Sequence, residues 1–232
     1  MSLPDHLIQE LEIKSLLVRE RYYRDSAQWK KLRQSYHPDA DKTSLNISWY
    51  ANLAISRVSQ TRYPSANDIA THRFSGTING FVAGSQRMVA SGTISSHTIQ
   101  PAEIEINGDK ALAASTGSVA VRAVVDGVEY EMVSLVRFYS RLSFCKTDSE
   151  SAWKLLTLEA VYDRDYVIPL DVSAKHSTPA IEVPPGARES YKYLDWMLSK
   201  RGFAIARDLP GLDDMESVQK VMDEAQVWLR ES

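Results

Sequence analysis

Hydrophobic side chains recur every three to four residues in the first part of the chain and every second residue from His97 onward. The first period indicates helices with one buried face, and the second indicates strands. Three amphipathic helices are therefore expected: one after Pro4, one capped by Ser26, and one over 78–89. Residues 43–50 have the pattern of a strand, and residues 51–76 are too polar to assign. The apolar positions that define the helices are Leu7, Ile8, Leu11, Ile13, Leu16 and Leu17; Trp29, Leu32 and Tyr36; and Ile78, Phe81, Val82, Met88 and Val89.

Strong turn signals divide the alternating region into a meander. Asn107-Gly108 and Asp126-Gly127 are dipeptides typical of type I′ hairpins, which need a positive φ at both central residues. Together with a polar loop at 146–151 they delimit four antiparallel strands. Helices followed by such a meander predict an α+β fold.

The C-terminal segment differs in composition from the rest. A proline-rich stretch follows the meander, and two amphipathic helical patterns follow that stretch. We therefore expect a domain at 1–165 and a helical extension at 166–232. The extension should pack on the domain, over its mouth, or on a neighbouring subunit, because its apolar faces need cover.

Composition excludes several classes of function. The 232 residues carry a formal net charge of −3 and no basic run, which disfavours a nucleic-acid partner. Cys145 is the only cysteine, so an internal disulfide is excluded. No secretory leader and no apolar run near the ~20 residues of a membrane span is evident, so we expect a cytoplasmic protein without a membrane partner.

Familiar cofactor and metal motifs are also missing. The chain contains no GxGxxG, GxxxxGK[ST], HExxH or GxSxG pattern. Its five histidines share no i,i+4 spacing, so a metal site would need ligands from distant segments. The prediction is a protein without cofactor or metal.

The remaining candidates for chemistry have two interpretations each. Asp25 alone has the position of a helix-end carboxylate. His97 is either a loop histidine or a base at the mouth of a pocket. Five aromatic residues are more often core residues than ligand contacts, although a pocket lined by buried tyrosines is polar where their hydroxyls need partners. They are Tyr22, Tyr23, Trp49, Tyr50 and Tyr139. The run of small side chains around Ser115 indicates tight packing or a cavity about equally.

Two segments, "YYRDSAQWKKLRQSYHPDA" and "SSHTIQPAEIEINGDKAL", resemble the NTF2-like superfamily in its SnoaL-like, scytalone dehydratase-like branch. In that branch an Asp ends the first helix and a His enters the third strand, where this chain has Asp25 and His97. The resemblance covers about residues 5–165 and implies a cone: a curved antiparallel sheet wrapped around N-terminal helices.

The resemblance also implies a function. Asp25 would orient His97, and His97 would act as general base in a cofactor-independent lyase (dehydratase-like), isomerase or cyclase. The substrate would be a small, mostly apolar or aromatic metabolite, such as a polyketide- or terpenoid-like intermediate of secondary metabolism. The expected substrate-binding residues are Tyr22, Tyr23, Trp49, Tyr50, Ser115 and Leu135.

Two reservations accompany this prediction. The polar groups of scytalone dehydratase correspond to positions near Ser115, Val133 and Leu135, so the same substrate is not expected. The fold also serves non-catalytic binding and assembly proteins, which is the alternative function. An open sheet face should be covered by a second copy, so a homodimer or other homo-oligomer is expected.

Overall fold

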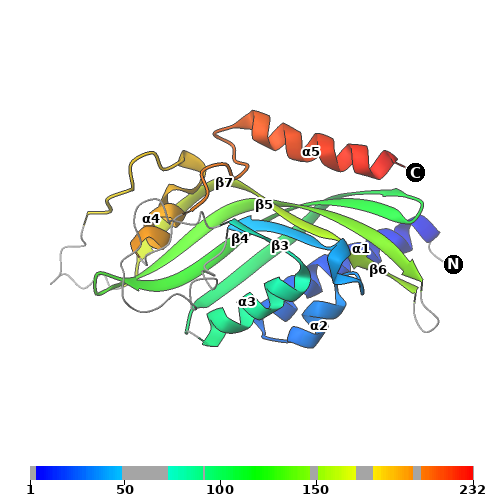
Figure 1. The fold of residues 1–232 in the computed structure, drawn as a ribbon, viewed down its shortest axis with the longest axis horizontal. Coiled ribbons are helices and arrows are strands. Elements are labelled where there is room, and N and C mark those ends of the chain that lie inside the picture. Colours follow the sequence, from blue (N-terminus) through cyan, green and yellow to red (C-terminus); the bar gives the residue numbers. More distant parts are fainter. Residues whose placement is uncertain are drawn as a thin grey trace.

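The computed structural model describes residues 4–48, 73–90, 92–146, 151–170, 180–200 and 205–231, and a curved seven-stranded sheet forms its centre (Figure 1). The strand order is β2-β1-β7-β5-β4-β3, with β6 paired to β5. Strand β1 is parallel to β7, and the other pairs are antiparallel. The strands are β1 (Ser44–Ser48), β2 (Arg73–Gly76), β3 (Ile94–Asn107), β4 (Lys110–Val125), β5 (Val128–Lys146), β6 (Ser151–Leu155) and β7 (Thr157–Pro169).

Both predicted hairpins are present, but the first turn lies one residue later than expected. Asp126 and Gly127 have φ values of 50° and 83°, as a type I′ turn requires. In the first hairpin Asn107 pairs with Lys110, so Gly108 and Asp109 are the central residues, and only Gly108 has a positive φ, of 62°, as in a type II′ turn. The two turns join β3 to β4 and β4 to β5 in a continuous antiparallel ladder. The last strand of the predicted meander is divided, because β6 and β7 pair with different parts of β5.

Three helices lie on the concave face of the sheet. They are α1 (Asp5–Asp25), α2 (Trp29–Gln34) and α3 (Ile78–Ala90), with the short 3-10 helix η1 (Ala40–Lys42) following α2. Figure 1 shows them together below the sheet. Their buried side chains, including Ile13, Leu17, Leu32 and Phe81, join those of the strands in one core. The predicted α+β cone is thus confirmed.

The C-terminal helices pack against the sheet in two places. After the 3-10 helix η2 (Glu189–Tyr191), α4 (Lys192–Lys200) lies against β5 and β7. The Asp165 carboxylate of β7 accepts the backbone N–H of Leu194 at 2.7 Å, which fixes the first turn of α4. The Trp196 ring of α4 meets Tyr130 of β5 edge-on, with ring centroids 5.2 Å apart.

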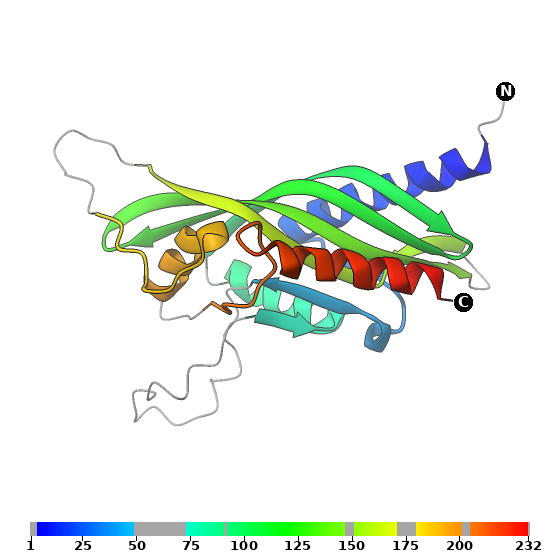
Figure 2. The same cartoon turned by 90° about the horizontal axis from the view of Figure 1, so that it is seen from above.

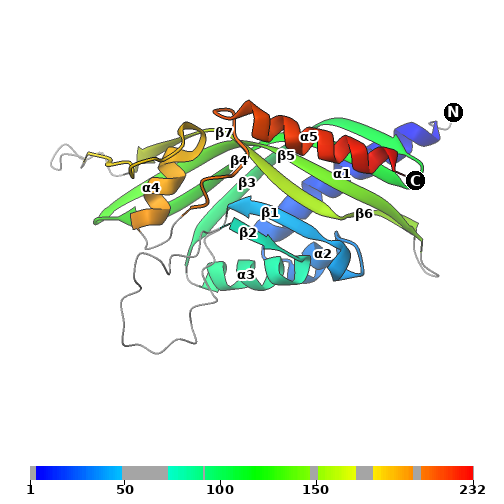
Figure 3. The same cartoon turned by 45° about the horizontal axis from the view of Figure 1, so that its top comes forward.

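Helix α5 (Met215–Arg230) lies on the outer face of the sheet, opposite α1–α3 (Figures 2 and 3). Its Val218 and Val221 pack on Val161 of β7, and its Leu229 carbonyl accepts a hydrogen bond from Asn107 at 2.9 Å. Part of the face that we expected a second copy to cover is therefore covered within the chain. Among the described residues, no helix combines the length and apolar character of a membrane span.

Candidate functional site

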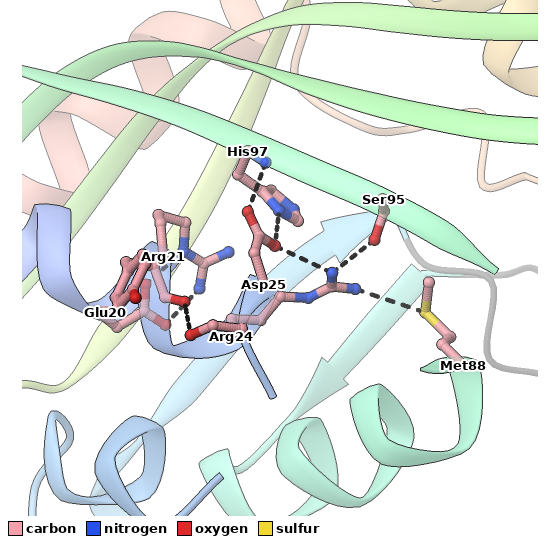
Figure 4. Close-up of polar contacts among 9 residues, drawn as sticks. Glu20, Arg21, Arg24, Asp25, Met88, Ser95 and His97 are labelled. Carbon is pink, nitrogen blue, oxygen red and sulfur yellow. Dashed lines mark hydrogen bonds and ion pairs between the residues drawn. The ribbon is translucent and has the colours of Figure 1, made fainter. Parts of the chain in front are cut away.

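Asp25 and His97 are joined by two hydrogen bonds (Figure 4). Asp25 is the last residue of α1, and His97 lies near the start of β3. The Asp25 Oδ2 atom accepts the backbone N–H of His97 at 2.7 Å, and Oδ1 lies 2.8 Å from His97 Nδ1. Because one contact holds the backbone and the other the ring, the carboxylate fixes both the position and the rotation of the imidazole.

The surroundings of this pair set its protonation state. Burial opposes the charged form of Asp25, but hydrogen bonds from His97 outweigh it and lower the pKa of the carboxyl below 3.8. Burial is the main cause that lowers the pKa of His97 from its ordinary 6.5, although Asp25 acts against it. At neutral pH the ring is therefore neutral, Nδ1–H donates to the Asp25 carboxylate, and Nε2 is left as a proton acceptor.

His97 forms part of the wall of a cavity of about 60 Å³ between the concave face of the sheet and helices α1, α3 and α4. This volume is several times what a single water needs. The polar lining residues are Arg21, Arg24, Ser95, His97 and Ser134. The apolar lining residues are Ile47, Phe81, Met88, Val119, Val121, Met132, Val136, Phe138, Ala160 and Leu194, together with the ring of Tyr162.

A buried ion pair from α1 lies at one side of the cavity. The Arg21 guanidinium donates through Nε and Nη2 to the two carboxylate oxygens of Glu20, and both residues are 2% exposed. The hydroxyl of Tyr36 donates to Glu20 at 2.9 Å. Burial by itself would lower the pKa of Arg21, but the Glu20 carboxylate raises it above its ordinary range. Arg21 is therefore a permanent cation in the cavity wall.

Arg24 connects the Asp25–His97 pair to β3 and α3. Its Nη1 lies 3.1 Å from Asp25 Oδ1 and also donates to the hydroxyl of Ser95, while Nη2 lies 3.9 Å from Met88 Sδ. With His97 neutral, the formal charges of Glu20, Arg21, Arg24 and Asp25 cancel. The cavity thus offers local positive groups without a net charge.

The order of these elements, with helices α1–α3 enclosed by β3-β4-β5-β7 and the Asp25–His97 contact inside, decides the fold. This arrangement agrees with the cone that the resemblance to the NTF2-like superfamily implies.

Comparisons with known proteins give distant similarities. No protein-family model matches the chain. It is 22% identical over 221 residues to the uncharacterized protein AN9274 of Emericella nidulans, a match that covers 90% of this chain and 78% of that protein. What AN9274 does is not stated by its name, so the match transfers no activity.

Solved structures are similar at 12–20% identity. An NTF2-like protein with a cystatin-like fold from Novosphingobium aromaticivorans is 20% identical, with a TM-score of 0.40 over 73% of this chain and 86% of that one. A type 3 hexachlorocyclohexane dehydrochlorinase from Novosphingobium barchaimii is 15% identical, with a TM-score of 0.43 over 76% and 98%. The Kfla4162 protein of Kribbella flavida is 12% identical, with a TM-score of 0.48 over 67% and 91%.

The cone does not bring every expected binding residue to the cavity. Leu135 alternates to the outer face of β5, while its neighbours Ser134 and Val136 line the cavity, so the expectation for Leu135 is corrected by one position. The sequence contained the signal, because odd positions of this strand carry Glu129, Glu131, Arg137 and Arg141, and even positions carry its largest apolar side chains.

The other expected binding residues have different positions. Tyr22 is 61% exposed and outside the cavity wall, because it lies on the solvent side of α1. Tyr23 is partly buried against the core, with Lys31 Nζ 5.4 Å from the centre of its ring. Ser115 is buried in β4 but does not line the cavity. Trp49 and Tyr50 lie outside the described residues.

Sequence reasoning missed the charged residues of α1 that the fold buries. Glu20, Arg21 and Arg24 continue the buried face that Ile13 and Leu17 begin, at the same three- and four-residue spacing. Charged side chains on the apolar face of a predicted helix are the signal that would have identified them.

Proposed function

We propose that this chain is a cofactor-independent lyase or isomerase in which His97 removes a proton from a small, mostly apolar substrate. The observation that carries the proposal is the Asp25–His97 contact at the wall of an apolar cavity. A carboxylate bonded to Nδ1 holds the tautomer in which Nε2 is basic, and it stabilises the imidazolium that forms on proton transfer.

The reaction would start with removal of a substrate C–H proton by Nε2 of His97. The electrons of that bond move toward a carbonyl oxygen, or they expel a leaving group from the neighbouring carbon. The Arg21 guanidinium then stabilises the negative charge that develops on the substrate. In an isomerase, His97 returns the proton to another atom of the substrate. In a lyase, the substrate loses both the leaving group and the proton.

The lining of the cavity favours a neutral substrate. Its wall carries the guanidinium groups of Arg21 and Arg24, and each is already paired with a neighbouring carboxylate, Glu20 or Asp25. Aliphatic and aromatic side chains form most of the remaining wall, including Phe81, Met132 and Phe138. A fully charged substrate would lose its hydration there and would have to compete with these carboxylates for the two guanidinium groups.

A thermal-shift screen followed by product analysis tests the proposal. Neutral ketones, enones and hydroxyketones of aromatic or terpenoid type are added to the protein, because compounds that bind only the folded state raise its melting temperature. Compounds that raise it are then incubated with the protein, and double-bond migration or elimination is followed by ultraviolet absorbance and mass spectrometry. Tight binding without any conversion would favour the alternative, a non-catalytic binding protein.

Turnover should depend on pH through His97. The pKa of His97 is lowered from 6.5 by burial, so the neutral base is fully present at pH 7 and is lost only as the pH falls through the lowered pKa. We expect kcat/KM to be constant near neutrality and to fall at acid pH with a midpoint below 6.5. A profile that rises toward acid pH would contradict this role.

Folding stability should decrease over the same acid range. Since the unfolded chain binds the His97 proton more readily than the folded chain does, lowering the pH below 6.5 favours unfolding. Melting temperatures of the native protein and a His97→Gln variant, measured across pH, separate this contribution from those of the other groups.

Adjacent positions on β5 should differ in their effect on ligand binding. Ser134→Ala removes a hydroxyl from the cavity wall without adding a bulkier side chain, whereas Leu135→Asn changes only the outer face of the strand. For a compound found in the screen, Kd should change about tenfold in the first variant and little in the second. Equal effects from both would show that the compound binds elsewhere.

A further inference from the structure

The solvent-facing side of α1 carries a row of large apolar side chains, although a surface helix normally presents polar residues there. Ile8 is 40% exposed, Leu11 55%, Val18 47% and Tyr22 61%. Together with Leu7 they make up five of the fourteen exposed large hydrophobic side chains of the described residues. Ser15, also exposed, lies among them, and we call Ile8, Leu11, Ser15, Val18 and Tyr22 the α1 stripe.

The spacing of the α1 stripe is nearly symmetric about Ser15. Ile8 and Tyr22 each lie seven residues from Ser15, which is about 10.5 Å along a helix axis. Leu11 lies four residues before Ser15 and Val18 three residues after it, about 6 and 4.5 Å away. A two-fold axis at Ser15 would therefore place large side chains opposite large ones and the smallest side chain opposite itself.

Charges on one flank of the stripe agree with the same axis. Glu12 and Arg19 are exposed and lie two helical turns apart, so they project on the same side of the stripe. In an antiparallel pair, Glu12 comes opposite Arg19 of the partner subunit, and the reciprocal contact forms as well. In a parallel pair this flank would face the opposite flank of the partner helix, so Glu12 and Arg19 would not meet.

We propose that a second copy of this chain binds along the α1 stripe, antiparallel, with the two-fold axis at Ser15. A closed two-fold contact needs a surface that is complementary to itself, and the stripe has this property in shape and in charge. The small Ser15 side chains allow the two helices to approach closely at the axis. The proposal is independent of the proposed catalytic function, and it gives exposed Tyr22 a role at a subunit interface.

Sedimentation and light scattering across micromolar concentrations test the interface. The native chain should have the mass of a dimer, and Val18→Glu should raise the dissociation constant about tenfold or more, because it buries a charge without a partner. Val124→Glu is the matched control, since Val124 is 64% exposed on β4 and away from α1. A monomer mass for the native chain, or a dimer that Val18→Glu leaves intact, would overturn the proposal.

Charge reversal and cross-linking test the orientation. Glu12→Arg and Arg19→Glu should each weaken the dimer, and the double variant should recover it. In a Cys145→Ser background, an Ile8→Cys chain mixed with a Tyr22→Cys chain should form a mixed disulfide dimer on oxidation. Preferential cross-linking of Ile8→Cys with itself would show a parallel pair and contradict the antiparallel arrangement. Circular dichroism of each variant verifies that the chain remains folded.

Discussion

His97→Ala is expected to reduce kcat/KM about 10²–10⁴-fold on a compound that the native protein converts, because the variant lacks the group that accepts the proton. The fold should be retained, since the substitution leaves the backbone N–H of His97 bonded to Asp25. Turnover is measured by steady-state kinetics, and folding by circular dichroism and thermal melting.

Asp25→Asn extends this test to the orienting carboxylate. The asparagine amide can donate to Nδ1, which moves the ring proton to Nε2 and removes the base. We expect a loss on the order of that in His97→Ala, and the double variant should be little worse than either single one, because the two groups act as a unit. Additive losses would show that Asp25 and His97 act separately.

His37→Ala is the matched control for the dyad. His37 also has a ring nitrogen close to an aspartate, since Nδ1 accepts the backbone N–H of Asp39 at 3.1 Å, but it lies outside the cavity wall. Its removal should leave turnover unchanged. A loss comparable to that of His97→Ala would indicate that the reaction takes place elsewhere, and near-normal turnover in His97→Ala would favour the binding-protein alternative.

Arg21→Met is expected to lower the free energy of unfolding by about 3–5 kcal/mol, because it leaves the Glu20 carboxylate buried without its partner. The methionine preserves most of the side-chain volume against Phe81, so the loss reflects the charge rather than a cavity. Urea denaturation followed by circular dichroism measures the change.

The double variant Glu20→Gln/Arg21→Met separates the unpaired charge from other effects. Glutamine keeps an oxygen acceptor for the hydroxyl of Tyr36, and no charge remains buried. Most of the stability lost in Arg21→Met should therefore return, while the cation at the cavity wall stays absent. If turnover then remains low in a stable protein, Arg21 contributes to the reaction as well as to folding.

Lys14→Met provides the comparison for an exposed ion pair on the same helix. Lys14 pairs with Glu10 one turn away, and their side chains are 38% and 35% exposed. Water and salt screen such a pair, so its loss should cost less than about 1 kcal/mol. Equal effects from Lys14→Met and Arg21→Met would contradict the buried-charge explanation.

The sequence alone determined the features that depend on neighbouring residues. Periods of 3.6 and 2 located the helices and strands, and the turns at Gly108 and Gly127 follow from conformations that few other residues adopt. The positions of Asp25 and His97 in the chain also supported their meeting, although only through the resemblance to the NTF2-like superfamily. Their hydrogen bonds connect residues 72 positions apart.

The tertiary structure decided which sides of these elements line the cavity. The alternation of side chains along β5 directs Ser134 toward the cavity and Leu135 toward the outer face. The sheet buries Glu20 and Arg21, and their mutual hydrogen bonds replace those that water would make. Helix α5 covers part of the outer sheet face, whereas the stripe with Tyr22 stays exposed on α1. Alternation along β5 and charges on the apolar face of α1 marked these inward positions in the sequence. Local pattern could not determine which of them border a cavity or pair with one another, because that depends on which distant segments pack against each face.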